Sequence, residues 1–334
     1  MVEAGSFDTE HLDFIHDVSY DYYGKRIATC SSDRTVKIWE KGDTGEWEKM
    51  AELNAHDGAV WKVVWANPEF GSIIATCSFD KTVQIWEEKK IMKNHKEFSS
   101  SWHPRARLLE SRASVEDIKF APRHLQLQLA ACSKDGKLRI YEAHDVMNLS
   151  QWSTTAELQV STSAGCNCAS WNECITDPPM LIIGCDLASQ VGMSENGPVA
   201  DASSNTDNLL QIWTYKDHLK KWELSKKLTH DLGHTDSIND VAWAPNWGRT
   251  FHMIASCSRD KKIILWKLFI ENPEKSDQDI QIEYEPITIL NDHMAEVWRL
   301  SWNIMGTQFC SSGEDNVVRV WRPKPDNKNW VCTG

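Results

Sequence analysis

The chain has 334 residues, of which 41% are hydrophobic and 25% are charged, and this composition predicts a packed globular protein. A formal net charge of −12 disfavours binding to nucleic acid or to an anionic membrane surface as a main activity, because both need a basic footprint. No stretch approaches the ~18 consecutive apolar residues that span a bilayer, and the acidic segment 1–17 is unlike a signal peptide, so we expect a cytosolic or nuclear protein.

Six segments alternate between apolar and polar residues, as half-buried strands do, and each ends in an aromatic residue. In chain order these aromatics are Trp39, Trp86, Tyr141, Trp213, Trp266 and Trp321. An aspartate stands six residues before each of them: Asp33, Asp80, Asp135, Asp207, Asp260 and Asp315. Aspartate is favoured in tight turns because its side chain accepts hydrogen bonds from nearby backbone N–H groups. The pattern predicts six copies of one structural unit.

A second aromatic ends an earlier strand of each unit: Tyr20, Trp65, Phe120, Trp171, Trp243 and Trp302. Four units carry a histidine nine residues before it: His11, His56, His234 and His293. The same four units carry a hydroxyl four residues before the turn aspartate: Thr29, Thr76, Ser256 and Ser311. The third unit has Ser111 and Ala131 at these positions, and we align Thr162 and Gly184 of the fourth unit with them.

The histidine and the hydroxyl occur together and are lost together, as expected of partners in one buried hydrogen-bond network. We therefore predict four tetrads of histidine, hydroxyl, aspartate and tryptophan, in which the histidine bridges the aspartate and the hydroxyl, and the hydroxyl reaches the indole N–H. A catalytic His–Asp–Ser set would occur once, whereas this arrangement occurs four times, so the repetition favours a structural role.

Each unit supplies four short strands, which predicts an all-β fold: a six-bladed WD-repeat β-propeller over residues 14–334, preceded by an N-terminal strand or arm over 1–13. The steps between successive final aromatics are 47 to 72 residues, longer than the usual ~40–45, so several connections carry insertions. We place the largest insertion at 187–206 between the second and third strands of blade four. Further polar or basic excursions fall at 271–281 in blade five and at 88–112 in blade two.

The ends of the chain leave two possibilities open. The last strand is expected near 329–333, so the six blades are complete and the first ten residues are left over. Either the propeller closes with a loose N-terminal arm, or it stays open and a partner protein fills a seventh position, because an unpaired sheet edge invites strand addition. In the second case Val2, Ala4 and Phe7 are the residues we expect to contact the partner.

Among the remaining polar and cysteine residues, the sequence predicts no cofactor site, no metal site and no catalytic site. Cys30, Cys77, Cys132 and Cys257 recur at one position of the repeat, as small buried strand residues do. Cys166, Cys168 and Cys174 cluster, but their spacing fits no common zinc pattern. No nucleophile–base pair or phosphate-binding loop is left over. A peptide-reading surface on the loops before the first strands would rest on Lys62, Trp298 and Arg299 alone.

The segments 16–39, 119–152 and 296–321 resemble the Seh nucleoporin family, which is related to the coat propeller called Sec-thirteen. The likeness covers nearly the whole chain and is weakest across 187–235 and 268–285. Segments 141–152 and 329–334 are similar to the Seh branch rather than to the coat branch, whereas 21–39 suits both.

The resemblance implies an open six-bladed propeller that an α-solenoid partner completes by donating a blade. It implies a non-catalytic scaffold subunit of a hetero-oligomer in two assemblies. In the Y-shaped subcomplex of the nuclear pore the partner is an α-solenoid nucleoporin. In the GATOR-type (SEA-type) complex, which regulates TOR signalling at the lysosome or vacuole, it is the Mio-class subunit. A kinetochore location is also implied. The alternative is a vesicle-coat subunit of the Sec-thirteen type.

Overall fold

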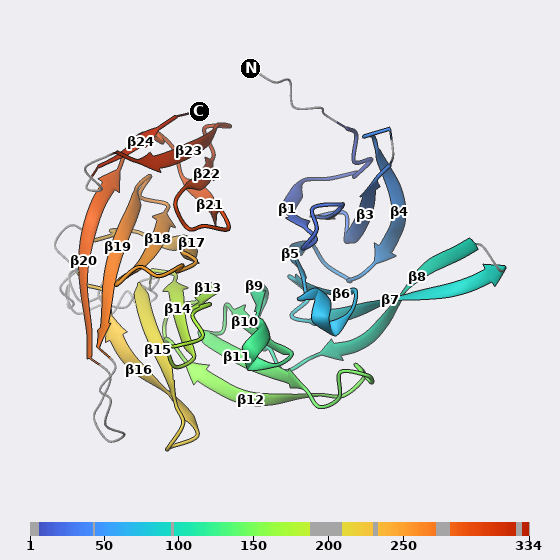
Figure 1. Ribbon diagram of the computed structural model, residues 1–334, viewed down its shortest axis with the longest axis horizontal. Coiled ribbons are helices and arrows are strands. Elements are labelled where there is room, and N and C mark those ends of the chain that lie inside the picture. The colour runs from blue at the N-terminus through green and yellow to red at the C-terminus, as the bar shows by residue number, and fades with distance from the viewer. Residues whose placement is uncertain are drawn as a thin grey trace, which may run out of the picture. The chain divides into compact units, whose positions relative to one another are not determined.

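The computed structural model describes residues 7–42, 44–94, 97–187, 209–229, 233–271, 281–324 and 329–333. Over these residues the chain forms six four-stranded sheets, which we number as blades one to six (Figure 1). Helical structure in the described part is limited to two single 3₁₀ turns, Pro68–Phe70 and Arg123–Leu125. None of the described helical segments is long and apolar enough to cross a membrane.

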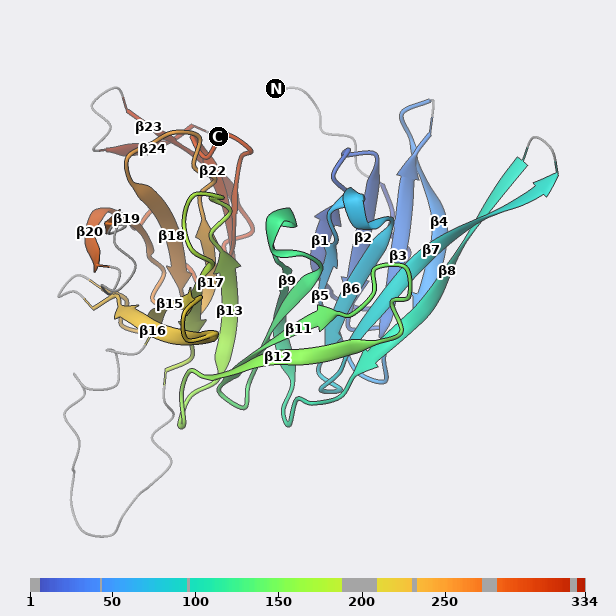
Figure 2. The same cartoon turned by 60° about the horizontal axis from the view of Figure 1, so that its bottom comes forward.

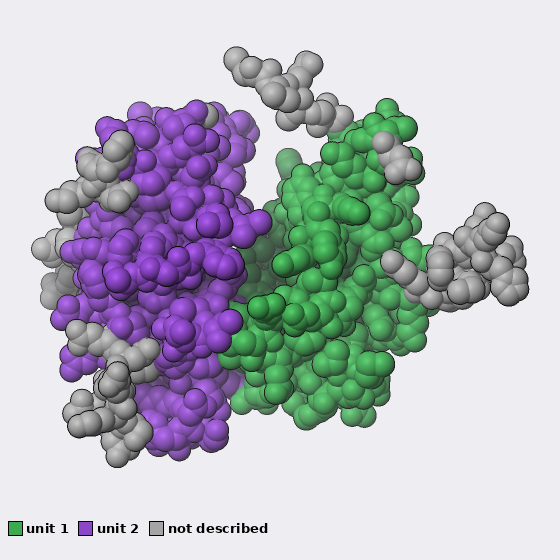
Figure 3. Space-filling model, viewed as in Figure 1, with its two compact units in different colours: residues 1–135, 139–155 green, residues 136–138, 156–334 purple. Residues whose placement is uncertain are grey.

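The chain divides into two compact units (Figure 3). Unit one comprises residues 1–135 and 139–155, and unit two comprises residues 136–138 and 156–334. Blades one and two belong to unit one, blades four to six belong to unit two, and β11 and β12 of blade three have residues in both.

In every blade the sheet follows the order of the four strands in the chain. Blade one contains β1 (Ile15–Tyr20), β2 (Arg26–Ser31), β3 (Thr35–Lys41) and β4 (Trp47–Asn54). Blade two contains β5 (Val60–Trp65), β6 (Ile73–Ser78), β7 (Val83–Asn94) and β8 (Glu97–Leu108). Blade three contains β9 (Val115–Phe120), β10 (Gln128–Ser133), β11 (Lys137–Ala143) and β12 (Trp152–Gln159).

The blades of unit two are built in the same way. Blade four contains β13 (Cys166–Trp171), β14 (Met180–Cys185), β15 (Leu210–Lys216) and β16 (Lys221–Lys227). Blade five contains β17 (Ile238–Trp243), β18 (His252–Ser258), β19 (Ile263–Glu271) and β20 (Gln281–Leu290). Blade six contains β21 (Val297–Trp302), β22 (Phe309–Gly313), β23 (Val318–Pro323) and β24 (Trp330–Cys332).

The core lies between successive blades within each unit. One apolar cluster joins blades one and two, another joins blades two and three, and two more join blades four, five and six. The second strand of a blade is covered on both faces, which is why β6 and β18 are buried along their whole length and read as continuous runs of small and apolar residues. The recurring cysteines Cys30, Cys77, Cys132 and Cys257 are all buried in these strands.

The first and second strands of every blade pair antiparallel with a register irregularity at the start of the first strand. In blade one it falls between Ile15 and Asp17, and the same irregularity recurs in the other five blades. Such a bulge re-aims the side chains that follow it. The residues directly after it are Asp17, Lys62, Asp117, Cys168, Asp240 and Arg299.

Of the three predicted insertions, one forms a hairpin, and the other two lie largely outside the described residues. Segment 88–112 is largely a hairpin, in which β7 and β8 continue past β5 and β6 (Figure 2). The expected loop at 187–206 lies outside the described residues from position 188 onward. The expected insertion at 271–281 separates β19 from β20, and its positions 272–280 also lie outside them.

The two ends of the fold match the predicted strand positions to within a residue. The first strand begins at Ile15, and the last strand is Trp330–Cys332. Residues 7–14, the described part of the predicted N-terminal strand or arm together with Phe14, contain no strand. Val2 and Ala4 lie outside the described residues.

Candidate protein-binding site

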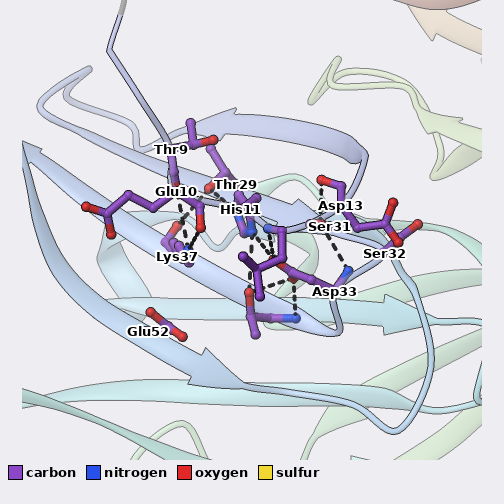
Figure 4. Close-up of polar contacts among 12 residues, drawn as sticks. Thr9, Glu10, His11, Asp13, Thr29, Ser31, Ser32, Asp33, Lys37 and Glu52 are labelled. Carbon is purple, nitrogen blue, oxygen red and sulfur yellow. Dashed lines mark hydrogen bonds and ion pairs between the residues drawn. The ribbon is translucent and has the colours of Figure 1, made fainter.

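The structure brings the four predicted residues of blade one together, and Figure 4 shows three of them, His11, Thr29 and Asp33. His11 Nδ1 lies 2.8 Å from Asp33 Oδ2, and its Nε2 lies 2.9 Å from Thr29 Oγ1. The indole N–H of Trp39 donates to Thr29 Oγ1 at 3.1 Å. Because the ionised Asp33 carboxylate only accepts, the Nδ1–H of His11 donates to it, and Nε2 accepts from the Thr29 hydroxyl. The network is therefore a chain of donors that runs from the indole to the carboxylate.

The aspartate of the network also closes the turn between the second and third strands. Asp33 accepts hydrogen bonds from the backbone N–H groups of Thr35 at 2.9 Å and Leu12 at 3.1 Å. The residue after the aspartate has a positive φ in all five described turns: Arg34, Lys81, Gly136, Lys261 and Asn316. One carboxylate thus anchors the turn and the chain that enters the blade, which explains why aspartate stands at this position.

The carboxyl groups of Asp33 and Asp80 are strongly acidic. Burial alone would raise the pKa of each, but hydrogen bonds outweigh it. The donors are chiefly Thr35 and His11 for Asp33, and His56 and Thr82 for Asp80, and they hold both pKa values far below the usual range. Both groups therefore stay ionised and serve as fixed acceptors.

Blades five and six repeat the complete network. His234 lies 3.0 Å from Asp260 Oδ2 and 2.8 Å from Ser256 Oγ, and Trp266 donates to Ser256 at 2.9 Å. In blade six the corresponding distances are 2.9 Å from His293 to Asp315, 2.7 Å from His293 to Ser311 and 2.8 Å from Trp321 to Ser311.

Blade two is incomplete. His56 lies 3.0 Å from Asp80 Oδ2 and 2.8 Å from Thr76 Oγ1, as expected. The indole N–H of Trp86, however, has no hydrogen-bond partner among the described residues. Trp86 belongs to the apolar cluster between blades one and two, against which the partly buried Ala51, Trp65 and Trp102 also pack. Its side chain is held by apolar packing rather than by the predicted hydrogen bond.

Blade three replaces the histidine with an arginine that the sequence patterns did not single out. Arg139 is buried and donates from Nη2 to Asp135 Oδ2 at 2.8 Å, and from Nη1 to Ser111 Oγ at 3.4 Å. It stands two residues before the final aromatic, Tyr141. The signal that could have pointed to it is that this position of the third strand carries a long polar side chain in five of the six blades: Lys37, Gln84, Arg139, Gln211 and Arg319.

Blade four uses a glutamine from the same position of the third strand. Trp213 donates its indole N–H to Gln211 Oε1 at 3.1 Å, and Gln211 donates to the Val160 carbonyl at 3.1 Å. The alignment of Gly184 with the hydroxyl residues is wrong, because Ile183 pairs with Gln211 and occupies that place. The long connection between β14, which ends at Cys185, and β15, which begins at Leu210, makes counting back from the turn aspartate fail there. Thr162 is exposed, and Asp207 lies outside the described residues.

Charged residues on the first strands link adjacent blades of unit one. Lys62 Nζ lies 3.8 Å from Asp17 and 3.6 Å from Asp117, and all three side chains are largely buried. Asp17 also accepts the backbone N–H of Val63 at 3.3 Å. In unit two, Asp240 accepts the N–H of Leu300 at 2.9 Å. Lys62, one of three residues considered for reading a peptide, is thus occupied within the fold.

The first strand of unit one leaves apolar side chains uncovered that are buried in other blades. Ile15, Val18 and Tyr20 of β1 are 41%, 52% and 59% exposed. The pairing registers of β1 with β2 and of β17 with β18 match them to blade five residues. Those equivalents are Ile238, Val241 and Trp243, with exposures of 0%, 1% and 5%. We call Ile15, Val18 and Tyr20 the β1 face.

Blade six of unit two has an uncovered strand of its own. Val318 of β23 is 61% exposed, whereas its equivalent in blade five, Ile263, is 0% exposed. Cys310 and Val320, which pair with each other across β22 and β23, are only partly buried, whereas their blade five equivalents Ala255 and Leu265 are fully buried. We call Cys310, Val318 and Val320 the β23 face.

Phe7 does not lie on either face. Its ring packs against Trp39 at a centroid distance of 5.1 Å and against Trp47 at 5.9 Å, so it belongs to the interior of blade one. The following backbone is held by Lys37, whose Nζ donates to the Glu10 carbonyl at 2.6 Å (Figure 4). The sequence analysis predicts that Phe7 contacts a partner, and in the structure it contacts its own blade.

Over the described residues, no group of three or more histidine, cysteine, aspartate or glutamate side chains is arranged to hold a metal ion. Cys166 and Cys168 are buried on β13, and Cys174 lies on the loop after it, with its sulfur 3.1 Å from the Thr176 hydroxyl. The histidine–aspartate contacts recur from blade to blade, so they hold the blades rather than mark a single reactive centre.

The six blades and their recurring networks define a six-bladed WD-repeat β-propeller of the all-β class. The family model of the WD domain, G-beta repeat, matches residues 5–40, 47–87, 225–267 and 284–322. These matches end on the third strands of blades one, two, five and six, which are the four blades with the histidine and the hydroxyl.

The chain is 42% identical over 337 aligned positions to nucleoporin SEH1 of Bos taurus and to that of Homo sapiens, covering 100% of this chain and 88% of each relative. It is also 42% identical to nucleoporin SEH1 of Danio rerio, covering 87% of that protein. The chain therefore belongs to the nucleoporin SEH1 family.

Proposed function

We propose that this protein is a non-catalytic scaffold subunit of the nuclear pore that binds an α-solenoid nucleoporin of the Y-shaped subcomplex by accepting strands from it. The observation that carries the proposal is the exposure of the β1 face and the β23 face, at positions that are buried in blade five. Membership of the nucleoporin SEH1 family supports the assembly, and the uncovered strands support the mode of binding.

The physical argument follows from burial. Moving apolar side chains such as Ile15 and Val318 from half exposure to full burial contributes roughly 1 kcal/mol each. A partner that packs strands against both faces would cover them as neighbouring blades cover the equivalent residues of blade five. Obligate interfaces of this kind bury ~2,000 Å² or more. The rigid links between blades, such as Lys62 between Asp17 and Asp117, suit a scaffold because they fix the surfaces that the partner meets.

We propose that the same two faces bind the Mio-class subunit of the GATOR-type (SEA-type) complex, which places the protein at the lysosomal or vacuolar surface in TOR signalling, and that the nuclear envelope and the kinetochore are its other locations. The family resemblance supports these assignments. Because a single pair of faces is used, one molecule would hold one solenoid at a time. Overexpression of one partner should therefore displace the other, which co-precipitation can measure.

The test is capture of the solenoid nucleoporin of the Y-shaped subcomplex by the full chain after co-expression. We expect Val18→Glu and Val318→Glu to abolish capture, because each places a charge where apolar surface must be buried. Ile175→Glu is the matched control, since Ile175 is an exposed apolar residue on a loop of blade four, outside both faces. Thermal unfolding of each isolated variant should equal that of the wild type.

Capture that survives both face variants would contradict strand donation at these faces. A truncation variant should lack residues 1–6 rather than 1–10. The longer deletion would also remove Phe7 and Glu10, whose contacts with Trp39 and Lys37 stabilise blade one. Capture of a vesicle-coat cage protein in place of the nucleoporin would support the Sec-thirteen-type alternative instead.

A further inference from the structure

A pocket of about 570 Å³ opens between blades five and six of unit two, separate from the β1 and β23 faces. Its lining includes Arg249, Phe251, Met253, Pro286, Pro323 and Trp330. The volume falls in the range of ~300–1,000 Å³ typical of ligand pockets. Most of its walls are aromatic, aliphatic and proline side chains, and its other charged residues, Lys267 and Glu285, pair with each other at 3.3 Å.

The pocket exists because the outer strand of blade six is short. β24 has three residues, whereas β20, the outer strand of blade five, has ten. The described part of blade six therefore does not cover the whole length of β19 and β20. Met253 and Trp330, which belong to the apolar cluster between the two blades, line the uncovered end.

Arg249 brings an uncompensated positive charge to this apolar pocket. Its guanidinium donates to the carbonyls of Pro245 at 2.6 Å and Gly306 at 2.9 Å, and no acidic side chain among the described residues pairs with it. Burial lowers its pKa. Arg26, at the smaller pocket between blades one and two, instead pairs with Glu40 at 3.3 Å and Glu88 at 2.7 Å.

The turn of blade six is shaped around this guanidinium. Gly306 has a φ of 62°, and a Cβ at its position would meet the Pro245 carbonyl and lie 2.8 Å from Arg249 Nη2. The fold thus fixes the arginine side chain in place before any ligand arrives. Preorganised charge of this kind reduces the entropy lost on binding.

The rim of the pocket exposes apolar side chains on the same two loops. Trp247 is 68% exposed, Ile304 80% and Met305 56%. The indole N–H of Trp247 donates to the Ile304 carbonyl at 2.8 Å, which joins the two loops. Exposed apolar side chains clustered beside a pocket indicate a protein-binding surface rather than a small-metabolite site.

The binding mode is side-chain recognition rather than strand addition. Pro286 lies on β20, the edge strand of blade five, and Pro323 ends β23, so neither offers a backbone N–H to an added strand. We propose that the pocket binds an extended peptide segment of a partner protein, with an apolar or aromatic side chain among Phe251, Pro286 and Trp330 and a neighbouring carboxylate on Arg249.

The test uses an array of capped octapeptides, in which one Phe, Leu, Trp or Tyr is combined with one Asp at spacings of one to four residues on either side. A matched array carries Asn in place of Asp. The probe is the full chain, and hits are measured in solution by fluorescence polarisation. A charge-assisted hydrogen bond predicts that Asp peptides bind about tenfold more tightly than their Asn counterparts.

Arg249→Gln should remove the preference for Asp over Asn, while Arg322→Gln, which changes an exposed arginine of blade six, should leave it intact. Because Arg249 also holds two carbonyls, Thr307→Glu provides a second variant on the exposed rim and should weaken the Asp peptides selectively. The proposal would be overturned if no octapeptide bound at concentrations on the order of 1 mM, or if wild type and Arg249→Gln showed the same ratio of Asp to Asn affinity.

Discussion

Arg139 donates from its guanidinium to the carboxylate of Asp135 at 2.8 Å, and so makes in blade three the contact that a histidine makes in four other blades. The same position, two residues before the final aromatic, provides Gln211 in blade four. In blade six it provides Arg319, which pairs with Asp315 beside a histidine that is still present. The third strand therefore supplies substitutes for the missing partners: Arg139 contacts the aspartate as the histidine does elsewhere, and Gln211 accepts the indole N–H as the hydroxyl does elsewhere.

Arg139→Met should destabilise the protein strongly. The side chains of Arg139 and Asp135 are both largely buried, and removal of one partner of a buried pair leaves a charge uncompensated, at a cost of about 3 kcal/mol. Arg319→Met is the control, because His293 still contacts Asp315 there, and we expect a loss of about 1 kcal/mol or less. Urea unfolding of both variants measures the difference, and equal losses would argue against a replacement role for Arg139.

Ser256→Ala should cost about 1–3 kcal/mol of unfolding free energy, because it leaves two buried polar groups without a partner. These are the indole N–H of Trp266 and the Nε2 atom of His234. Ser163→Ala, which removes an exposed hydroxyl on a loop, should be close to neutral. Calorimetric unfolding of the two variants tests this, and a neutral Ser256→Ala would show that the network adds little to stability.

The blade six network should weaken as the pH falls through the titration range of histidine. Burial lowers the pKa of His293, an effect that the hydrogen bond with Asp315 opposes and Arg319 reinforces. The unfolded chain, with a histidine pKa of about 6.5, then takes up the proton more readily. The stability contribution is present above about pH 6.5 and is lost below it.

His293→Gln should remove this part of the pH dependence. Urea midpoints of the wild type and the variant, followed from about pH 8 to about pH 5, should converge as the pH falls. Curves that stay parallel over this interval would mean that His293 titrates alike in the folded and unfolded chains.

Gly184→Ala should be destabilising even though alanine is compatible with a strand. An added Cβ would lie 2.5 Å from Cys168 Sγ, 2.7 Å from Ile238 Cγ2 and 2.9 Å from Val241 Cγ1. Overpacking of this kind costs about 1–3 kcal/mol. Gly42→Ala is the control, because the nearest atom to its Cβ would be the end of the flexible Glu48 side chain, at 3.3 Å, and the Glu46 carbonyl would lie at an ordinary contact distance of 3.6 Å. A midpoint for Gly184→Ala equal to that of Gly42→Ala would show that blades four and five have room to shift.

The repeat itself could be predicted from the sequence because its signals are local. Alternation with period two marks the strands, and the turn aspartate sits at a fixed distance from the final aromatic, so six blades and their bounds follow from counting. Histidine and hydroxyl, absent together from two blades, also reveal a network before any coordinates are known. Only tertiary structure shows that the network of blade two leaves the indole of Trp86 without a hydrogen bond.

Residue spacing along the chain does not predict the role of a residue whose partners come from other strands. The sequence aligns Gly184 with the hydroxyls, whereas the register assigns that place to Ile183, because the long connection between β14 and β15 breaks the fixed spacing. Arg139, Gln211 and Arg249 carry no motif, and each gains its role from atoms that lie far away in the chain or across a turn.

The repeat, the strand order and the family resemblance can be read from the amino-acid sequence alone, since they depend on residues a few places apart. Which apolar side chains stay uncovered and which charges stay uncompensated depends on the folded arrangement of the blades. Val18 and Val241 occupy the same repeat position, yet one is half exposed and the other is buried. Burial depends on what packs against a strand from outside its own blade, and no local pattern contains that information.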